Sequence, residues 1–428
     1  MAILTIRNFS CIDEARLELA QLTVLIGPQA SGKSVISKLL YFFNDILSRQ
    51  LIELQEGQPL DEFRSLLVED FKKWFPPSAW GSRKFDISYH AGPFFVKITR
   101  VIGKNKKKAA DADVRLNFSP WFEREYESFL KLIAQTRKAS KKSDFADIER
   151  FWRLDASFRQ RVSGELRDDY SSWQLFVPAG RSFFTSVGKA IAAFEHSGMI
   201  DPLTVRFGRF FATIRDERGG GTRVFRVGKK APTEQQQRVR NEMMNQLFGG
   251  NITFARGQEY VVSDDGRKIP FASLSSGQQE LLPLWLSIEA AQENSPNCRI
   301  YIEEPEAHLF PTAQSQVVEF LSSVISERRA KMVVTTHSPY VLTQINILLK
   351  AGQLAAQFPD ARPKIEKVVK QRNWLEPAST VAYAIVGRRV SKITDADGLL
   401  MGDYLDEVSG FLDREFSSLL EIEVAHAD

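Results

Sequence analysis

The sequence predicts an α/β fold with a mixed sheet flanked by helices. Three short apolar runs, LTVLI (22–26), RIYIEE (299–304) and KMVVTT (331–336), lead directly into glycine, carboxylate or histidine residues. Continuous apolar runs of this length are typical of strands buried on both faces of a parallel sheet. Since the carboxyl ends of parallel strands meet at one edge of the sheet, the polar residues that follow these runs are expected to gather there.

The composition is that of a globular protein, with 43% hydrophobic and 26% charged residues among 428, and the length suggests two or three structural units. A net charge of +4, from 57 basic and 53 acidic residues, is too small to argue for nucleic-acid binding. Two lysine-rich runs, 104–108 and 138–142, carry much of the excess. Such runs are solvated loops or contacts to a phosphate backbone, and both interpretations stay open.

Cysteine and histidine are scarce. Cys11 and Cys298 lie far apart in the sequence, so neither a disulfide framework nor a zinc site is indicated. The N-terminus lacks a basic segment followed by an apolar one, and no stretch is apolar enough for a membrane span. We therefore expect a cytoplasmic protein without membrane contact.

The first strands and helix follow from periodicity. Residues 2–10 alternate between apolar and polar and predict a half-buried strand, with 16–22 as its partner. The run 22–26 is stopped by a Gly-Pro pair, and 34–55 then places apolar residues at helical spacing. This order is the strand, loop and helix that a phosphate-binding loop requires.

We expect four segments along the chain. Residues 1–55 form the N-terminal part of a core domain that contains this loop, and 56–171, in which strands precede a long charged helical stretch, form an α+β insertion. Residues 172–345 return to the core, and 346–428 form a short C-terminal extension.

The stretch GPQASGKS (27–34) has the spacing G-x-x-x-x-G-K-[ST] of a phosphate-binding loop. Gly27 and Gly32 permit the tight curve that points backbone N–H groups inward, and the next helix adds its positive end. Lys33 would reach the β- and γ-phosphates, and Ser34 would help to hold Mg²⁺. A chance match is the alternative, but the flanking strand and helix favour nucleotide binding. The expected nucleotide contacts are Gly27, Pro28, Gln29, Ala30, Ser31, Gly32, Lys33, Ser34 and Val35.

Two adjacent carboxylates end the run that begins at Arg299. We expect Glu303 to lie near Mg²⁺, through water, and Glu304 to polarise the water that attacks the γ-phosphate. The other interpretation is an exposed acidic loop. The next run ends at His337, whose imidazole would bond a γ-phosphate oxygen or orient the water. A histidine after a strand is often structural, but one helix and one loop fit between the carboxylates and His337. The predicted catalytic residues are thus Lys33, Glu304 and His337.

A fourth motif, LSSGQ (274–278), stands between the phosphate loop and the acidic pair. Together the four motifs resemble, in order, those of ABC-type ATPases: phosphate loop, signature motif, acidic strand end and switch histidine. The resemblance implies an ABC-type P-loop ATPase head whose signature residues bind the γ-phosphate held by the opposite subunit of a homodimer. It assigns this contact to Ser275 and close approach to Gly277, with Ser276 where the family usually has glycine. The implied signature contacts are Ser275, Ser276, Gly277 and Gln278.

The long separation of phosphate loop and signature resembles the soluble RecF, SMC and OLD group, and EEPEAHLFP (303–311) with TTHSPYVL (335–342) resembles OLD-like defence ATPases. Their usual DEPEAHLHP has aspartate and histidine where this chain has Glu303 and Phe310. The chain resembles stand-alone ATPase subunits of bacterial anti-phage systems of the PARIS and Septu type. That implies a higher homo-oligomer, a separate effector partner such as a nuclease, and a phage-derived trigger.

No built-in nuclease is expected. DAD (395–397) has the spacing of a metal-binding pair, but no glutamate-glycine strand precedes it, so a loop or a helix cap accounts for it better. Arg181, after an apolar strand, is predicted either to reach nucleotide or a neighbouring subunit, or to form a structural ion pair. Two other functions stay open: a RecF-like DNA-repair ATPase that clamps DNA, and a nucleotide-locked structural protein.

Overall fold

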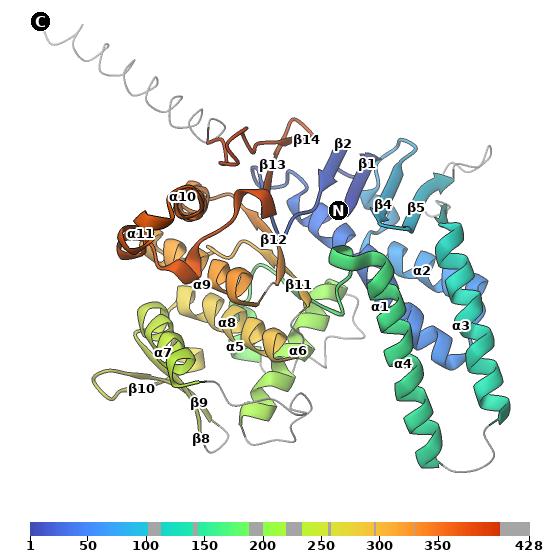
Figure 1. Cartoon of the computed structure of the whole chain (residues 1–428), viewed down its shortest axis with the longest axis horizontal. Coiled ribbons are helices and arrows are strands. Elements are labelled where there is room, and N and C mark those ends of the chain that lie inside the picture. The colour runs from blue at the N-terminus through green and yellow to red at the C-terminus, as the bar shows by residue number, and fades with distance from the viewer. Residues whose placement is uncertain are drawn as a thin grey trace, which may run out of the picture.

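The computed structural model shows helices packed on both faces of one long sheet (Figure 1). The described residues are 1–101, 113–139, 144–187, 200–219, 233–255, 258–294, 297–328 and 330–402. The lysine-rich run 104–108 and the chain after residue 402 lie outside them.

The long sheet has the order β6-β5-β4-β1-β2-β14-β13-β3-β12-β11-β7. Its strands are β1 Ile3–Phe9, β2 Ile12–Glu18, β3 Leu22–Ile26, β4 Asp86–Ala91, β5 Phe94–Val101, β6 Asp113–Phe118, β7 Trp173–Val177, β11 Cys298–Glu303, β12 Lys331–Thr336, β13 Thr380–Val386 and β14 Arg389–Lys392. One half, β6-β5-β4-β1-β2, is antiparallel, and the run β13-β3-β12-β11-β7 is parallel. The halves meet where Arg389 of β14 pairs with Glu14 of β2. Separately, β8 Gly250–Ala255, β9 Gln258–Ser263 and β10 Lys268–Pro270 form a small antiparallel sheet.

Each parallel strand contributes side chains to two hydrophobic cores, one on each face of the sheet, because successive side chains point to opposite faces. In β3, Leu22, Val24 and Ile26 pack with helices α8 Ser276–Asn294, α9 Pro311–Arg328 and α10 Pro339–Gln357. Leu25 points the other way, toward α1 Lys33–Glu56 and α2 Leu60–Trp74. All five residues of β3 are buried, as the apolar run predicts.

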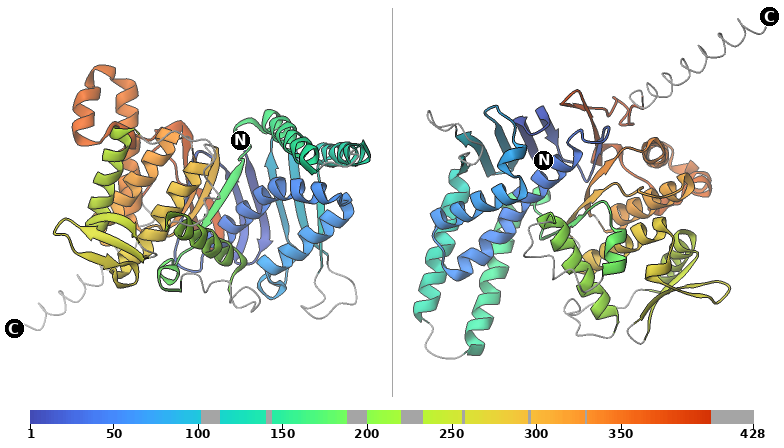
Figure 2. Two further views of the ribbon diagram at one scale, coloured as in Figure 1. Left: turned by 90° about the horizontal axis from the view of Figure 1, so that it is seen from below. Right: turned by 180° about the vertical axis from the view of Figure 1, so that it is seen from behind.

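The remaining helices surround this framework; they are α3 Pro120–Ala139, α4 Asp144–Leu166, α5 Ser182–Val187, α6 Pro202–Arg218, α7 Glu234–Phe248 and α11 Arg362–Val368. Helices α3 and α4 lie side by side and project together beyond the sheet (Figures 1 and 2). Phe129 of α3 and Phe158 of α4 pack edge to face, with ring centroids 4.7 Å apart. None of the helices in the described ranges is long and apolar enough to cross a membrane.

The long sheet takes strands from all four predicted segments. Strands β4, β5 and β6 come from 56–171, the predicted insertion, and extend the sheet from β1. Strand β13 comes from 346–428, the predicted extension, and pairs with β3 beside the phosphate loop. Strand pairing therefore joins these segments to the core, while the boundaries between them stay predictions.

Candidate active site

The phosphate loop joins β3 to α1 in the predicted way, and its glycines are required by close packing. Gly32 caps α1 with φ at 106°, a backbone conformation that favours glycine. A Cβ at Gly32 would lie 2.8 Å from the Cys11 sulfur, and one at Gly27 would lie 2.9 Å from the Ile385 carbonyl oxygen. The β1–β2 turn and β13 thus press against the loop from two sides.

Lys33 is buried inside this loop. Its Nζ donates to the carbonyl oxygens of Gly27 and Pro28, at 2.7 and 2.9 Å. Burial lowers the pKa of Lys33, against the opposing effect of the acidic side chains near it. The ammonium lies where the loop curves around a phosphate in nucleotide-binding proteins, so bound phosphate oxygens would compete with these two carbonyls for its protons.

Glu303 is buried beside Ser34 at the end of β11. Burial raises the pKa of Glu303, while a hydrogen bond to the Ser34 side chain acts in the opposite direction. Its Oε2 accepts from the N–H of Ala179 at 3.4 Å, and its Oε1 has no hydrogen-bond partner among the described residues.

This pair fits a Mg²⁺ site of the kind that uses few protein ligands. Within the described part of the chain, no group of three or more His, Cys, Asp or Glu side chains could hold a metal. Mg²⁺ commonly keeps several waters and binds through one or two carboxylates plus substrate phosphates. The Ser34 hydroxyl and the unpartnered oxygen of Glu303 match that donor set.

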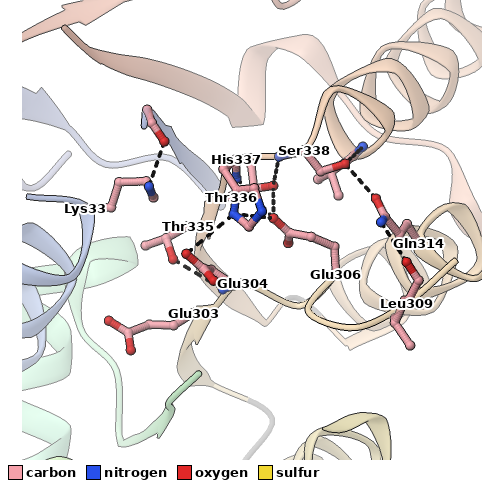
Figure 3. A network of polar contacts seen from close by, with 12 residues as sticks. Lys33, Glu303, Glu304, Glu306, Leu309, Gln314, Thr335, Thr336, His337 and Ser338 are labelled. Carbon is pink, nitrogen blue, oxygen red and sulfur yellow. Dashed lines mark hydrogen bonds and ion pairs between the residues drawn. The ribbon is translucent and has the colours of Figure 1, made fainter. Parts of the chain in front are cut away.

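His337 lies between two carboxylates, as Figure 3 shows. Its Nδ1 is 3.5 Å from Oε1 of Glu304 and 3.6 Å from Oε1 of Glu306. Glu304 has a positive φ of 44° and donates its N–H to the Thr335 carbonyl at 2.9 Å. The two predicted catalytic side chains, Glu304 and His337, are thus neighbours at adjacent strand ends.

Glu306 is a site residue that sequence reasoning missed. Its Oε1 accepts from the Thr336 hydroxyl at 2.6 Å and from the His337 N–H at 3.0 Å, so it fixes the backbone that carries the imidazole. The side chain is 2% exposed, and its Oε2 has no partner among the described residues. A third carboxylate so close to an acidic pair was the available signal in the sequence.

Arg181 forms the structural ion pair, the second of its two predicted roles. The side chain is fully buried, and its Nε lies 3.5 Å from Oε2 of Glu280. Its other donors bond the carbonyl oxygens of Glu303 at 2.6 Å and Glu304 at 3.0 Å. These bonds hold the backbone of residues 303–308, the acidic turn that follows β11, and the buried guanidinium has no access to a neighbouring subunit.

The signature motif caps the N-terminus of α8. The Ser275 hydroxyl bonds Oε1 of Gln278 at 3.0 Å and accepts from the Gln278 N–H at 3.4 Å. Ser275 and Ser276 are exposed, whereas a Cβ on buried Gly277 would lie 2.8 Å from the His308 carbonyl oxygen. The close approach that Gly277 permits is therefore to the acidic turn of its own chain.

A pocket of about 450 Å³ opens beside Glu304, Glu306 and His337. Its lining includes Gln29, Glu304, Glu306, His337 and Tyr340, but none of the four signature residues. The structure thus brings together the phosphate loop, the acidic turn and His337, whereas the signature residues lie outside this lining. DAD is a turn, in which Asp395 accepts from the Leu399 N–H at 2.8 Å.

Comparison with known proteins finds one family that is similar to part of this chain. Residues 200–342, about a third of the chain, match the AAA ATPase domain family. This range contains the signature, the acidic turn and His337. No curated protein is significantly similar to the chain. The mixed sheet and its flanking helices confirm the predicted α/β fold class.

Several solved structures resemble the chain weakly. The SMC head domain from Thermotoga maritima is 12% identical, with a TM-score of 0.36, and covers 91% of this chain and 97% of its own. An SMC head bound to the C-winged helix domain of ScpA is 12% identical, with a TM-score of 0.40. The match covers 91% of this chain and 96% of that one. The third structure is an SMC head domain with an extended coiled coil, bound to the C-terminal domain of ScpA derived from Pyrococcus furiosus. It is 12% identical, with a TM-score of 0.37, and the match covers 97% of this chain and 99% of that one. These likenesses are too weak to assign a function or a partner.

Proposed function

We propose that the chain is a Mg²⁺-dependent ATPase that acts as a nucleotide-driven switch in a homodimer. The observation that carries this proposal is that the signature residues lie outside the pocket that the other motifs line. Lys33, Glu304 and His337 converge at one edge of the sheet, while Ser275 and Ser276, exposed at the start of α8, do not line the pocket there. A second copy that offers its α8 N-terminus would complete the site.

Each residue of the half-site has a role that its contacts support. Lys33 leaves the loop carbonyls to bind the β- and γ-phosphates. Ser34 and Glu303 hold Mg²⁺, which, when bound, neutralises charge on the transferred phosphate. Glu304 orients the attacking water and accepts its proton, while His337 bonds the γ-phosphate or that water. Hydrolysis removes the γ-phosphate that the partner's signature serine would bind, and so weakens the dimer.

The biological setting proposed for this switch is anti-phage defence, and it is supported by the resemblance of the acidic and histidine motifs to OLD-like ATPases. In that setting the ATP-bound assembly holds a separate effector, such as a nuclease, until a phage-derived trigger appears. Co-expression with proteins encoded beside the gene tests this idea. We expect one of them to bind the ATP-bound form and phage protection to be lost in Lys33→Ala.

Light scattering of size-separated protein tests the ATP-driven assembly directly. We expect Glu304→Gln to at least double its mass on addition of ATP and Mg²⁺, because ATP binds but is not hydrolysed. Adding Ser275→Arg to this variant should block the change. The matched control is Ser65→Arg, also at an exposed serine but on α2, which should assemble normally. A mass that is independent of ATP in Glu304→Gln contradicts the switch.

A further inference from the structure

We propose that the buried Arg181–Glu280 pair couples the two ATP sites of the dimer by tying each chain's acidic turn to its own signature helix. This inference rests on the proposed function, since it assumes that the signature acts on the partner's nucleotide. Within one chain, the acidic turn serves that chain's own ATP, whereas α8 serves the ATP of the partner. A rigid link between the two would make each site respond to the other.

On one side, Arg181 holds the backbone of the acidic turn. Its guanidinium bonds three carbonyl oxygens there and in its own loop, those of Glu303, Glu304 and Pro178, at 2.6, 3.0 and 3.1 Å. Glu304 has a positive φ that a non-glycine residue adopts only under constraint. The fork of donors on an arginine can satisfy several carbonyls at once, which a lysine cannot do in the same geometry.

On the other side, the same residue is fastened to α8. The carboxylate of Glu280 accepts the backbone N–H groups of Arg181 at 2.8 Å and Ser182 at 3.1 Å. Nε of Arg181 donates to the Glu280 carbonyl at 3.0 Å. Glu280 lies about one helical turn after Ser276, so a shift of the α8 N-terminus displaces it as well.

The link resists separation because both of its side chains, those of Arg181 and Glu280, are buried away from water. The Arg181 side chain is 0% exposed and that of Glu280 is 1% exposed. Burial lowers the pKa of Arg181, while Glu280 and the three carboxylates of the acidic turn oppose this change. Breaking one partner away would leave a buried charge uncompensated, so the acidic turn and the signature helix are held to move together.

Heterodimers with one intact composite site provide the test. One chain carries Ser275→Arg and supplies the phosphate loop, and the other carries Lys33→Ala and supplies the signature. Different tags and two purification steps isolate the mixed dimer. Arg181→Lys is then placed in either chain, and kcat and KM for ATP are measured. A role confined to the acidic turn lowers kcat only when the substitution is in the chain that supplies the phosphate loop, and a role confined to α8 lowers kcat only when it is in the chain that supplies the signature.

We expect kcat to fall in both placements by about 10- to 100-fold, the scale on which small misplacements of catalytic groups act, with KM changed less. The matched control is Arg215→Lys, in an ion pair with Glu259 between α6 and β9. A fall in one placement only, or no larger fall than the control, overturns the coupling. If Arg181→Lys does not fold, Glu280→Gln is placed in the same two chains instead, and its kcat values are judged by the same criteria. An inactive reference heterodimer instead overturns the composite site, and with it the proposed function.

Discussion

The two ends of β11 both carry buried polar groups, but only one end leaves them unsatisfied. At the start, Arg299 donates to Oδ1 of Asn44 at 3.1 Å, the Tyr89 hydroxyl at 3.3 Å and the Asp169 carbonyl at 3.3 Å. At the other end, Glu303 and Glu306 each keep a buried oxygen without a partner in the described structure. Buried polar groups are nearly always hydrogen-bonded in native proteins.

The comparison separates a structural network from a site that is prepared for a ligand. The network at Arg299 joins α1, β4 and β11, so it ties the antiparallel half of the sheet to the parallel half. At the opposite end, the unpartnered carboxylate oxygens of Glu303 and Glu306 can bind a metal ion or accept a hydrogen bond from a water molecule or a protonated phosphate. Three predictions test this difference, from the largest expected effect to the smallest.

Glu304→Gln should lower ATP turnover by about 100- to 10,000-fold, the range over which a positioned base contributes, while ATP still binds. The amide keeps the size of the side chain but cannot accept the proton of the attacking water. Turnover is measured by phosphate release and binding with a fluorescent ATP analogue. Loss of binding together with turnover would show that Glu304 supports the nucleotide rather than the water.

Arg299→Met should lower the free energy of unfolding by about 3 kcal/mol, because it leaves Asn44 and Tyr89 short of a buried partner. Denaturant unfolding measures the loss. Tyr301→Phe is the matched control in the same network. It removes one hydroxyl that donates to the Leu40 carbonyl at 3.2 Å and accepts from the Asn44 amide at 3.1 Å. Because the Asn44 amide still donates to the Leu40 carbonyl at 2.8 Å, the change should cost about 1 kcal/mol. Neither change should alter kcat by more than the loss of folded protein accounts for.

Glu303→Gln should stabilise the protein without nucleotide by about 1 kcal/mol at neutral pH, the scale of an unsatisfied buried polar group. Burial raises the folded-state pKa of Glu303. Its ionisation therefore costs stability as pH rises through the unfolded and then the folded pKa, and below both values this cost is absent. The advantage of the variant should grow from pH 4 toward pH 7 in thermal unfolding.

Glu319→Gln provides the control for this trend. Burial also raises the pKa of Glu319, but its two oxygens accept from Gln344 at 3.2 Å and Asn373 at 3.1 Å. Its amide variant loses an acceptor and should not be stabilised. Addition of ATP and Mg²⁺ should stabilise the wild type more than Glu303→Gln, which lacks the metal-binding carboxylate. An equal gain would contradict the metal role.

Local patterns in the sequence were enough for the phosphate loop and for the strand ends that carry Glu304 and His337. In each case the apolar pattern of a buried strand is followed directly in the chain by the polar residues of the site, so one short stretch of sequence predicts both. Glu306 and the partners of Arg181 were not predictable in this way. Their roles depend on which backbone groups the fold leaves buried beside them, and spacing along the chain does not encode that.

By itself, the sequence determined that a glycine-rich loop between strand and helix, an acidic strand end, a histidine strand end and a helix-capping serine motif follow one another in this order. Their motifs are local, because each needs only one strand or helix end to present its groups. Only the tertiary structure decided that β13 flanks β3 and that Gly277 packs on the acidic turn. It also decided that Arg181 is buried against Glu280. These facts arise from pairings between distant segments, where packing and the need to satisfy buried polar groups select one arrangement.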